Sequence, residues 1–371
     1  MQDVNFLIKP ASGLCNMRCR YCFYADEMQN RTQASAGLMT QDTAAALIRF
    51  ALASASRSCT FAFQGGEPTL AGLDFFRSFV AAARAQNEKR LQLSFAIQTN
   101  GYALDDEWAL FLAKEHFLVG VSLDGYAELH DLYRRDAAGA GTAKRALQSI
   151  RLLEKYGAEF NILTVITAQT AKHAAKLYRY YEKCGLRYQQ YIPCLDPLGA
   201  PRGSMPYSLT PALYGEFLTT LFDAWYADVL AGKKPYNRYF ENLTGMLLGQ
   251  PPEACGMLGH CTKQLVVEAD GRIYPCDFYV LDGFCIGDVH TDTLPQVDEK
   301  RAALGFIEQS LQLPAECRAC EWFSLCRGGC RRDRDTNGVL GRSCWCEAYR
   351  RFFPYAVPRL ARLAEAIRSG R

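Results

Sequence analysis

The fold of this chain is decided by the stretch Cys15-Asn-Met-Arg-Cys19-Arg-Tyr21-Cys22, which follows a strand-like run from Val4 to Lys9. Its three cysteines have the spacing C-x3-C-x2-C on a short loop. Thiolates are the usual ligands of iron–sulfur clusters, and a cubane cluster has four irons. Three protein thiolates therefore leave one iron with open coordination positions, which a chemically active metal site needs. A zinc or disulfide loop is the structural alternative.

Length and composition limit the classes of protein to which this chain can belong. The chain has 371 residues, enough for a full core and two domains. Its 42 basic and 39 acidic residues give a net charge of +3, too small to predict nucleic-acid or membrane binding. The N-terminal residues lack the pattern of a signal peptide, and no apolar run is long enough to span a bilayer. We therefore expect a cytoplasmic protein.

The sixteen cysteines are unevenly placed, and ten of them lie from Cys255 onwards. Disulfides rarely persist in a reducing compartment, so clustered cysteines there indicate metal ligands or redox groups. One group of cysteines at the start and another in the last third predict two kinds of metal site.

The segment up to about residue 232 alternates strand-like and helix-like patterns. Asp105 and Thr210-Pro211 are typical helix starts, and Gly157, Gly185 and Gly232 are typical helix ends. Six βα units in series predict a parallel sheet, as either a partial barrel or a doubly wound sheet. The strand candidates are Val4–Lys9, Cys59–Phe63, Leu91–Gln98, Phe117–Ser122, Glu159–Ile166 and Arg187–Ile192.

Polar motifs follow several of these strands, where the active site of a barrel lies. The second strand leads into Gln64-Gly65-Gly66-Glu67-Pro68, whose glycines let a ligand approach the backbone closely. The third and fourth lead into Gln98-Thr99-Asn100-Gly101 and Ser122-Leu-Asp124-Gly125. Ordinary turn chemistry explains Asn-Gly and Asp-Gly equally well.

The pattern C-x3-C-x-aromatic-C, with Gln-Gly-Gly-Glu-Pro one βα unit later, resembles the radical S-adenosylmethionine superfamily. The resemblance implies a six-unit partial TIM barrel over residues 1–232, with a 4Fe–4S cluster on Cys15, Cys19 and Cys22. It further implies that S-adenosylmethionine chelates the open iron. The residues that it places at this cofactor are Tyr21, Gln64, Gly65, Gly66, Glu67, Ser122 and Leu195. Arg134 is either a bidentate partner of the cofactor carboxylate or an ordinary surface arginine.

The last third contains G-x4-C, then C-x2-C-x5-C-x3-C, then a final cysteine. A zinc ribbon is the structural alternative. The order resembles the SPASM extension of peptide-modifying radical enzymes and implies a domain over residues 233–348, followed by a C-terminal helix over 349–371. By that resemblance two auxiliary 4Fe–4S clusters are held, one by Cys255, Cys261, Cys276 and Cys330, the other by Cys317, Cys320, Cys326 and Cys346.

The last ligand is open between Cys344 and Cys346, and we choose Cys346 because the segment after it resembles the closing segment of the family. The cysteines left over are expected to be free, buried apolar residues. They are Cys59, Cys184, Cys194, Cys285 and Cys344.

Within the superfamily, the stretches Leu7–Ser12, Phe61–Leu73 and Tyr274–Asp282 resemble the anaerobic sulfatase-maturating enzymes. The resemblance implies oxidation of a cysteine or serine to Cα-formylglycine, after a 5′-deoxyadenosyl radical takes a hydrogen atom from Cβ. The substrate would be an unfolded or nascent sulfatase with a Cys/Ser-x-Pro-x-Arg segment, and the electron donor a flavodoxin or ferredoxin. Asp277, beside Cys276, is the candidate base for the thiol or hydroxyl proton.

Two other functions are compatible with these residues. A maturase that forms a thioether or carbon–carbon crosslink in a ribosomally made peptide would use the same three clusters. Only fourteen residues precede Cys15, so we expect no N-terminal peptide-recognition domain, which counts against this alternative. A non-enzymatic zinc module is the alternative from another class.

Overall fold

All six predicted strands are present in the computed structural model, which describes residues 3–336 and 338–370. Their observed ends lie within one residue of those predicted. The strands are β1 (Asp3–Ile8), β2 (Ser58–Phe63), β3 (Gln92–Thr99), β4 (Phe117–Ser122), β5 (Glu159–Ile166) and β6 (Tyr188–Pro193).

The chain divides into two compact units. The first comprises Met1–Leu123, His130–Asn161 and Lys263–Gly305, and the second comprises Asp124–Leu129, Ile162–Thr262 and Phe306–Arg371. The units thus group the residues differently from the predicted division at residue 232. Residues 263–305 belong to the first unit because their strand β8 (Leu265–Val267) pairs in parallel with β1.

The sheet of the first unit has the order β10-β9-β8-β1-β2-β3-β4. β9 (Arg272–Tyr274) and β10 (Gly287–Asp288) add antiparallel strands beyond β8, and β1 to β4 are parallel. The register aligns one phenylalanine from each parallel strand, and neighbouring rings lie 5.4 to 6.1 Å apart. This aromatic row is Phe6, Phe61, Phe95 and Phe117. It buries large apolar surfaces in the centre of the unit.

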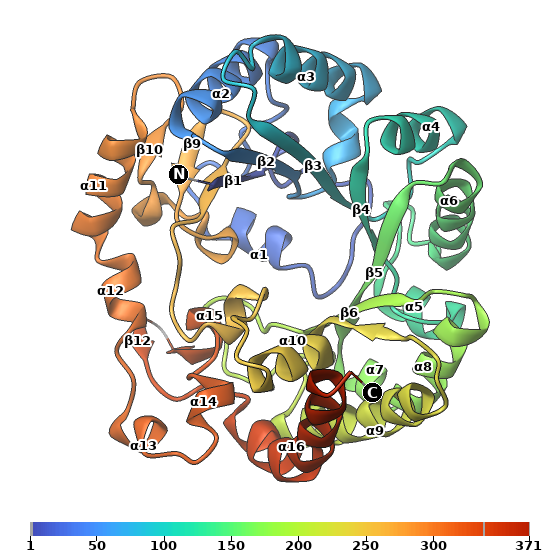
Figure 1. The fold of residues 1–371 in the computed structure, drawn as a ribbon. Helices are drawn as coiled ribbons and strands as arrows, with labels where there is room; N and C mark the ends of the chain where they lie inside the picture. The colour runs from blue at the N-terminus through green and yellow to red at the C-terminus, as the bar shows by residue number, and fades with distance from the viewer. Residues whose placement is uncertain (1–2, 337, 371) are drawn as a thin grey trace. The chain divides into compact units, whose positions relative to one another are not determined.

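Helices of the first unit cover the outer side of this sheet, whereas α1 (Phe23–Gln29) lies on the opposite side (Figure 1). The Asp105 side chain caps α4 by accepting a hydrogen bond from Trp108 N at 2.9 Å, and Gly157 ends α6 in the left-handed conformation, both as predicted. The helices of this unit are α2 (Gln41–Ser54), α3 (Leu73–Ala85), α4 (Asp106–Lys114), α6 (Ala143–Tyr156) and α11 (Leu294–Leu304), with 3-10 turns at Pro68–Ala71, Asp277–Tyr279 and Asp282–Phe284. The helix α5 (Ala127–Tyr133) has residues in both units.

The second unit contains most of β5 together with β6 and β7 (Tyr236–Asn237), which pair in parallel. Its helical core forms where Phe222 of α9, Phe240 of α10 and Phe352 of α16 meet with ring centroids 5.3 to 5.9 Å apart. Its other elements are α7 (Ala168–Ala171), α8 (Ala174–Lys183), α9 (Pro211–Leu230), α10 (Arg238–Leu247), a 3-10 turn at Cys255–Met257, α12 (Phe306–Ser310), α13 (Ala315–Arg318), α14 (Phe323–Cys326), α15 (Arg331–Arg334), β11 (Asp335–Thr336), β12 (Val339–Leu340) and α16 (Cys346–Arg368).

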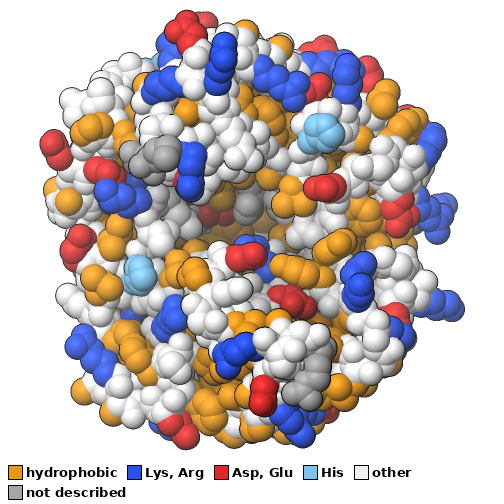
Figure 2. Space-filling model, viewed as in Figure 1, with side chains coloured by type: hydrophobic (Ala, Val, Ile, Leu, Met, Phe, Trp, Pro, Cys, Tyr) orange, Lys and Arg blue, Asp and Glu red, His pale blue; other side chains and the backbone are white. Residues whose placement is uncertain are grey.

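Basic and acidic side chains are interspersed on the visible face of the molecule (Figure 2), as expected for a small net charge. Within residues 3–336 and 338–370, no helix has the length and apolar character needed to cross a membrane.

Candidate active site

The three-cysteine loop lies after β1 in the first unit and is held by backbone hydrogen bonds. Arg18 N donates to Arg135 O at 2.7 Å, and Arg20 N donates to Tyr133 O at 3.0 Å. Cys15, Cys19 and Cys22 form no disulfide and are partly exposed. Burial, together with the charges of Glu67, Cys19 and Cys22, raises the pKa of Cys15 to about 12. The loop thus carries three soft sulfur donors that influence one another, which is the type of donor that a cluster bound by three thiolates needs.

The Gly-Gly-Glu-Pro loop after β2 packs directly against the backbone that leads into Cys15. Gly66 N donates to Ser12 O at 2.8 Å, and Glu67 N donates to Leu14 O at 2.7 Å. A Cβ atom on Gly66 would lie 2.0 Å from Leu14 O, and one on Gly65 would lie 2.9 Å from Ser12 O. Only glycine fits at position 66, so this loop and the cysteine loop are positioned together.

The carboxylate of Glu67 is occupied by donors from the protein. One oxygen accepts from Thr69 N at 3.1 Å and from the hydroxyls of Thr69 and Thr99 at 2.7 and 2.8 Å. The other accepts from Asn100 N at 2.8 Å. The side chain thus joins the ends of β2 and β3. If Glu67 contacts the cofactor, it does so through its backbone.

The other predicted cofactor residues lie in three places. The Arg134 guanidinium lies 5.4 Å from the ring centroid of Tyr21, and its Nη1 lies 4.0 Å from Cys19 Sγ. Ser122 lies at the end of β4, where its hydroxyl accepts from Gln98 Nε2 at 3.2 Å. Leu195 follows β6 in the second unit. The structure therefore brings Tyr21 and Arg134 to the cysteine loop, and places Ser122 at the carboxyl edge of the sheet.

Asp277 lies in a buried polar cluster with Lys9, Tyr24 and Gln64, all in the first unit. The Tyr24 hydroxyl donates to Asp277 Oδ2 at 2.6 Å, and Gln64 Nε2 donates to the same oxygen at 3.2 Å. Lys9 Nζ lies 4.0 Å from Oδ1, an oxygen without a hydrogen-bond partner among the described residues. Gln64, predicted at the cofactor, thus contacts the predicted base. One oxygen of Asp277 is thus held by two donors, while the other is buried without a hydrogen-bond donor among the described residues.

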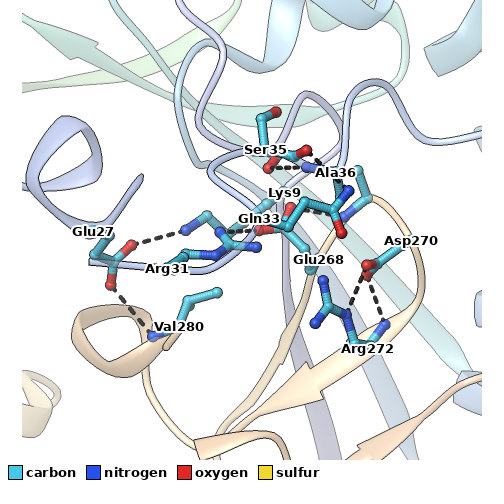
Figure 3. Close-up of polar contacts among 12 residues, drawn as sticks. Lys9, Glu27, Arg31, Gln33, Ser35, Ala36, Glu268, Asp270, Arg272 and Val280 are labelled. Atoms are coloured by element: carbon cyan, nitrogen blue, oxygen red, sulfur yellow. Dashed lines mark hydrogen bonds and ion pairs between the residues drawn. The ribbon is translucent and has the colours of Figure 1, made fainter. Parts of the chain in front are cut away.

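Lys9 is buried between carboxylates, and Figure 3 shows its contact with Glu27 at 3.1 Å. Burial lowers the pKa of Lys9, but Glu27, Asp277 and Glu268 raise it more, so the net pKa is raised. Burial raises the pKa of Glu27 to about 8 and also raises the pKa of Asp277, while Lys9 lowers both. Lys9 therefore supplies the positive charge that allows carboxylates to be buried here.

Sequence reasoning missed Lys9, Tyr24 and Glu27. Two signals were available, a lysine at the end of an apolar strand and a tyrosine and glutamate three residues apart on one helix face. The pairing of β8 with β1 was not predicted, and it brings the segment with Asp277 beside Lys9. Lys9 N donates to Val267 O at 2.8 Å in this pairing.

Of the first auxiliary set of cysteines, Cys255, Cys261 and Cys330 lie in the second unit and Cys276 in the first. Burial raises the pKa of Cys330, and Cys255 and Cys261 also act to raise it. These three thiols are therefore near neighbours.

The second auxiliary set lies entirely in the second unit. Burial raises the pKa of Cys326 to about 11, and Cys346, Cys317 and Cys320 also act to raise it. Cys344 has different neighbours, since burial raises its pKa to about 12 and the charged groups acting on it are Asp333, Arg202 and Asp196.

None of the sixteen cysteines, all of which the structure describes, forms a disulfide. Of those predicted to be buried apolar residues, Cys59 and Cys194 are buried, and Cys344 is partly exposed. The prediction is wrong for Cys184 and Cys285, which are exposed. Cys184 caps the end of α8 and Cys285 ends a 3-10 turn, so both lie where the chain leaves a short element at the surface.

Comparisons with known proteins match two regions of the chain to family models and its full length to named relatives. Residues 10–181 match the Radical SAM superfamily, and residues 255–321 match the SPASM iron–sulfur cluster-binding domain. The chain is 42% identical to a cysteine-type anaerobic sulfatase-maturating enzyme of Clostridium novyi, over 99% of both chains. It is 44% identical to the enzyme of that name from Clostridium perfringens, over 99% of this chain and 100% of the relative.

A solved structure described as native anSMEcpe with bound AdoMet and Cp18Cys peptide is similar to the whole chain. The TM-score is 0.95 at 43% identity, covering 99% of this chain and 100% of that one. This likeness establishes the radical SAM α/β fold, with a partial barrel-like parallel sheet and a C-terminal SPASM domain. Of the two architectures predicted, the partial barrel is confirmed.

Proposed function

This chain belongs to the family of the anaerobic sulfatase-maturating enzymes, and from that premise we propose how its residues act and on what. It is a radical S-adenosylmethionine oxidoreductase that generates formylglycine and carries three 4Fe–4S clusters. The proposed substrate is an unfolded or nascent sulfatase with the active-site segment Cys/Ser-x-Pro-x-Arg. Cysteine is the favoured residue because the full-length relatives at 42% and 44% identity are cysteine-type enzymes.

The cysteine loop is proposed to hold the cofactor pair. The donor set of Cys15, Cys19 and Cys22 leaves one iron open for S-adenosylmethionine, and together the two cofactors supply the species that removes a hydrogen atom from Cβ. Gly66 presents backbone to this site because no side chain fits there. Arg134, buried over Tyr21 and next to Cys19, is suited to the cofactor carboxylate.

Asp277 is proposed as the base that takes the proton from the substrate thiol. The observation that supports this role is that the two carboxylate oxygens of Asp277 have different hydrogen-bond partners. Tyr24 and Gln64 hold Oδ2, while the buried Oδ1 has no hydrogen-bond partner among the described residues. Lys9, 4.0 Å from Oδ1, favours the charged, proton-accepting form. An oriented carboxylate of this kind is what general base catalysis requires.

The auxiliary ligands are proposed as predicted, with Cys346 and not Cys344 completing the second set. The mutual influence of Cys317, Cys320, Cys326 and Cys346 supports this choice, as does the different environment of Cys344. Sites closed by four thiolates suit electron transfer better than substrate binding.

Removing each candidate last ligand separately tests this assignment. Cys346→Ala is expected to lose about four of about twelve irons, because one iron of that 4Fe–4S site would have neither a thiolate nor a cofactor to bind it. Cys344→Ala is expected to keep about twelve. Iron and sulfide are measured per chain after anaerobic reconstitution, and the reverse pattern would exchange the roles of the two cysteines.

A flavodoxin or ferredoxin is proposed as the electron donor, because both deliver single electrons. The proposed location of the protein is the cytoplasm. Sixteen cysteines that form no disulfide support a reducing compartment.

The function is tested by anaerobic incubation with a reductant, S-adenosylmethionine and a Cys-x-Pro-x-Arg peptide, followed by mass spectrometry. We expect formylglycine in place of cysteine, and a matched Ser peptide measures the substrate range. Accumulation of 5′-deoxyadenosine with an unchanged peptide would reject this substrate and favour the peptide-crosslinking alternative.

A further inference from the structure

Arg334 is a buried cation in the second unit whose hydrogen bonds all go to neutral groups. Its side chain is 1% exposed. Nη2 donates to Ser310 O at 2.7 Å, and Nη1 donates to Gln312 O at 3.1 Å. These bonds link α15 to the C-terminal end of α12 and the residues after it; Figure 1 shows the two helices. Among the described residues no carboxylate forms an ion pair with Arg334, and its Nε has no hydrogen-bond partner.

A buried guanidinium stays charged and normally needs an opposite charge nearby. Arg334 acts on Asp333 of the same helix, but burial raises the pKa of Asp333 and Arg202 is the cation that acts on it most strongly. The other acidic groups that act on Arg334 are thiols. Burial lowers the pKa of Arg334, while Cys261, Cys330 and Cys317 act to raise it.

The backbone geometry explains why thiols of the first auxiliary set lie near this side chain. Cys330 immediately precedes the four-residue helix α15, which ends at Arg334. Cys261 N donates to the hydroxyl of Ser310 at 2.8 Å, and the carbonyl of the same serine accepts from Arg334. Arg334 therefore lies near Cys261 and Cys330 of the first auxiliary set.

We propose that Arg334 is a positioning residue that raises the reduction potential of the first auxiliary cluster by placing a buried positive charge beside Cys261 and Cys330. The inference rests on the ligand assignment proposed above. Reduction adds negative charge to a cluster, so a nearby buried cation favours the reduced form. Clusters of higher potential are better electron acceptors, which suits an enzyme whose reaction is an oxidation.

The effect of the Arg334 charge is tested by redox titration of the reconstituted full-length enzyme. The titration is followed by electron paramagnetic resonance. Arg334→Gln removes the charge, and Arg334→Lys retains it. Arg332→Gln is the matched control, because Arg332 is buried in the same helix but donates to Asp196 O at 2.9 Å. Only preparations with about twelve irons per chain are compared, so a wrong ligand assignment shows first in the iron count.

We expect Arg334→Gln to make reduction of the first auxiliary cluster at least tenfold less favourable, about 59 mV for a one-electron couple. The reduction potentials of Arg334→Lys should lie closer to those of the wild type, and those of Arg332→Gln should be unchanged. Unchanged potentials in Arg334→Gln, or equal shifts in all three variants, would overturn the proposal. If Arg334→Gln fails to hold its iron, Arg331→Gln replaces it, because Arg331 also acts on Cys261. Unchanged reduction potentials in Arg331→Gln would likewise overturn the proposal.

Discussion

Asp277→Asn is expected to slow formylglycine formation by about 100- to 10,000-fold while all three clusters and S-adenosylmethionine binding are retained. Asparagine has nearly the same shape and can still meet the Tyr24 hydroxyl, which now lies 2.6 Å from Oδ2. It cannot take a proton from the substrate thiol. The rate of peptide oxidation is measured by mass spectrometry, together with iron content and S-adenosylmethionine binding.

Asp282→Asn is the matched control for this substitution. Asp282 is exposed, lies five residues further along the same unit and accepts hydrogen bonds from Thr32. The same chemical change there should leave turnover intact. Full turnover by Asp277→Asn would remove Asp277 from the mechanism, and loss of iron would show that it acts on the neighbouring ligand Cys276 instead.

Gly66→Ala is expected to abolish S-adenosylmethionine cleavage, although it adds a single methyl group. The new Cβ would lie 2.0 Å from Leu14 O and 2.5 Å from Gly13 C, and these are backbone atoms that cannot rotate away. Relief requires the backbone before Cys15 to move, at a cost on the order of 1–3 kcal/mol for overpacking. The measurements are cluster content, S-adenosylmethionine binding and 5′-deoxyadenosine formation.

Gly283→Ala provides the comparison for Gly66→Ala, since a Cβ there meets no atom within 4 Å. Neither glycine has a positive φ, so backbone strain does not distinguish the two substitutions. Normal cleavage by Gly66→Ala would mean that the loop before Cys15 can shift without harm to the cofactor site.

Lys9 and Asp277 mark the boundary between what local sequence predicts and what it cannot. The strand before Lys9 was readable from its apolar pattern, and Asp277 from its motif beside Cys276. Their proximity was not readable, because it depends on a three-residue strand, Leu265–Val267, that pairs with β1. A segment that short carries too little periodicity to be recognised. Similarly, the role of Gln64 as a partner of Asp277 depends on side-chain directions and not on its motif.

Glu67 shows the same limit within a motif that was recognised. The sequence Gln-Gly-Gly-Glu-Pro indicated a cofactor loop, but the Glu67 carboxylate is taken up by Thr69, Thr99 and Asn100. Which groups satisfy a buried carboxylate depends on the neighbouring strand, about thirty residues further along the chain.

The sequence by itself determined the six βα units, the three-thiolate loop after the first strand and the thiol-rich last third. Those features depend on local periodicity and on the spacing of ligands a few residues apart, both of which are written directly in the chain. Only the tertiary structure decided which polar groups surround Asp277, how Cys344 and Cys346 differ in their neighbours, and where Arg334 places its charge. These depend on contacts between residues distant in sequence, which arise when strands pair and helices pack, and no local pattern encodes them.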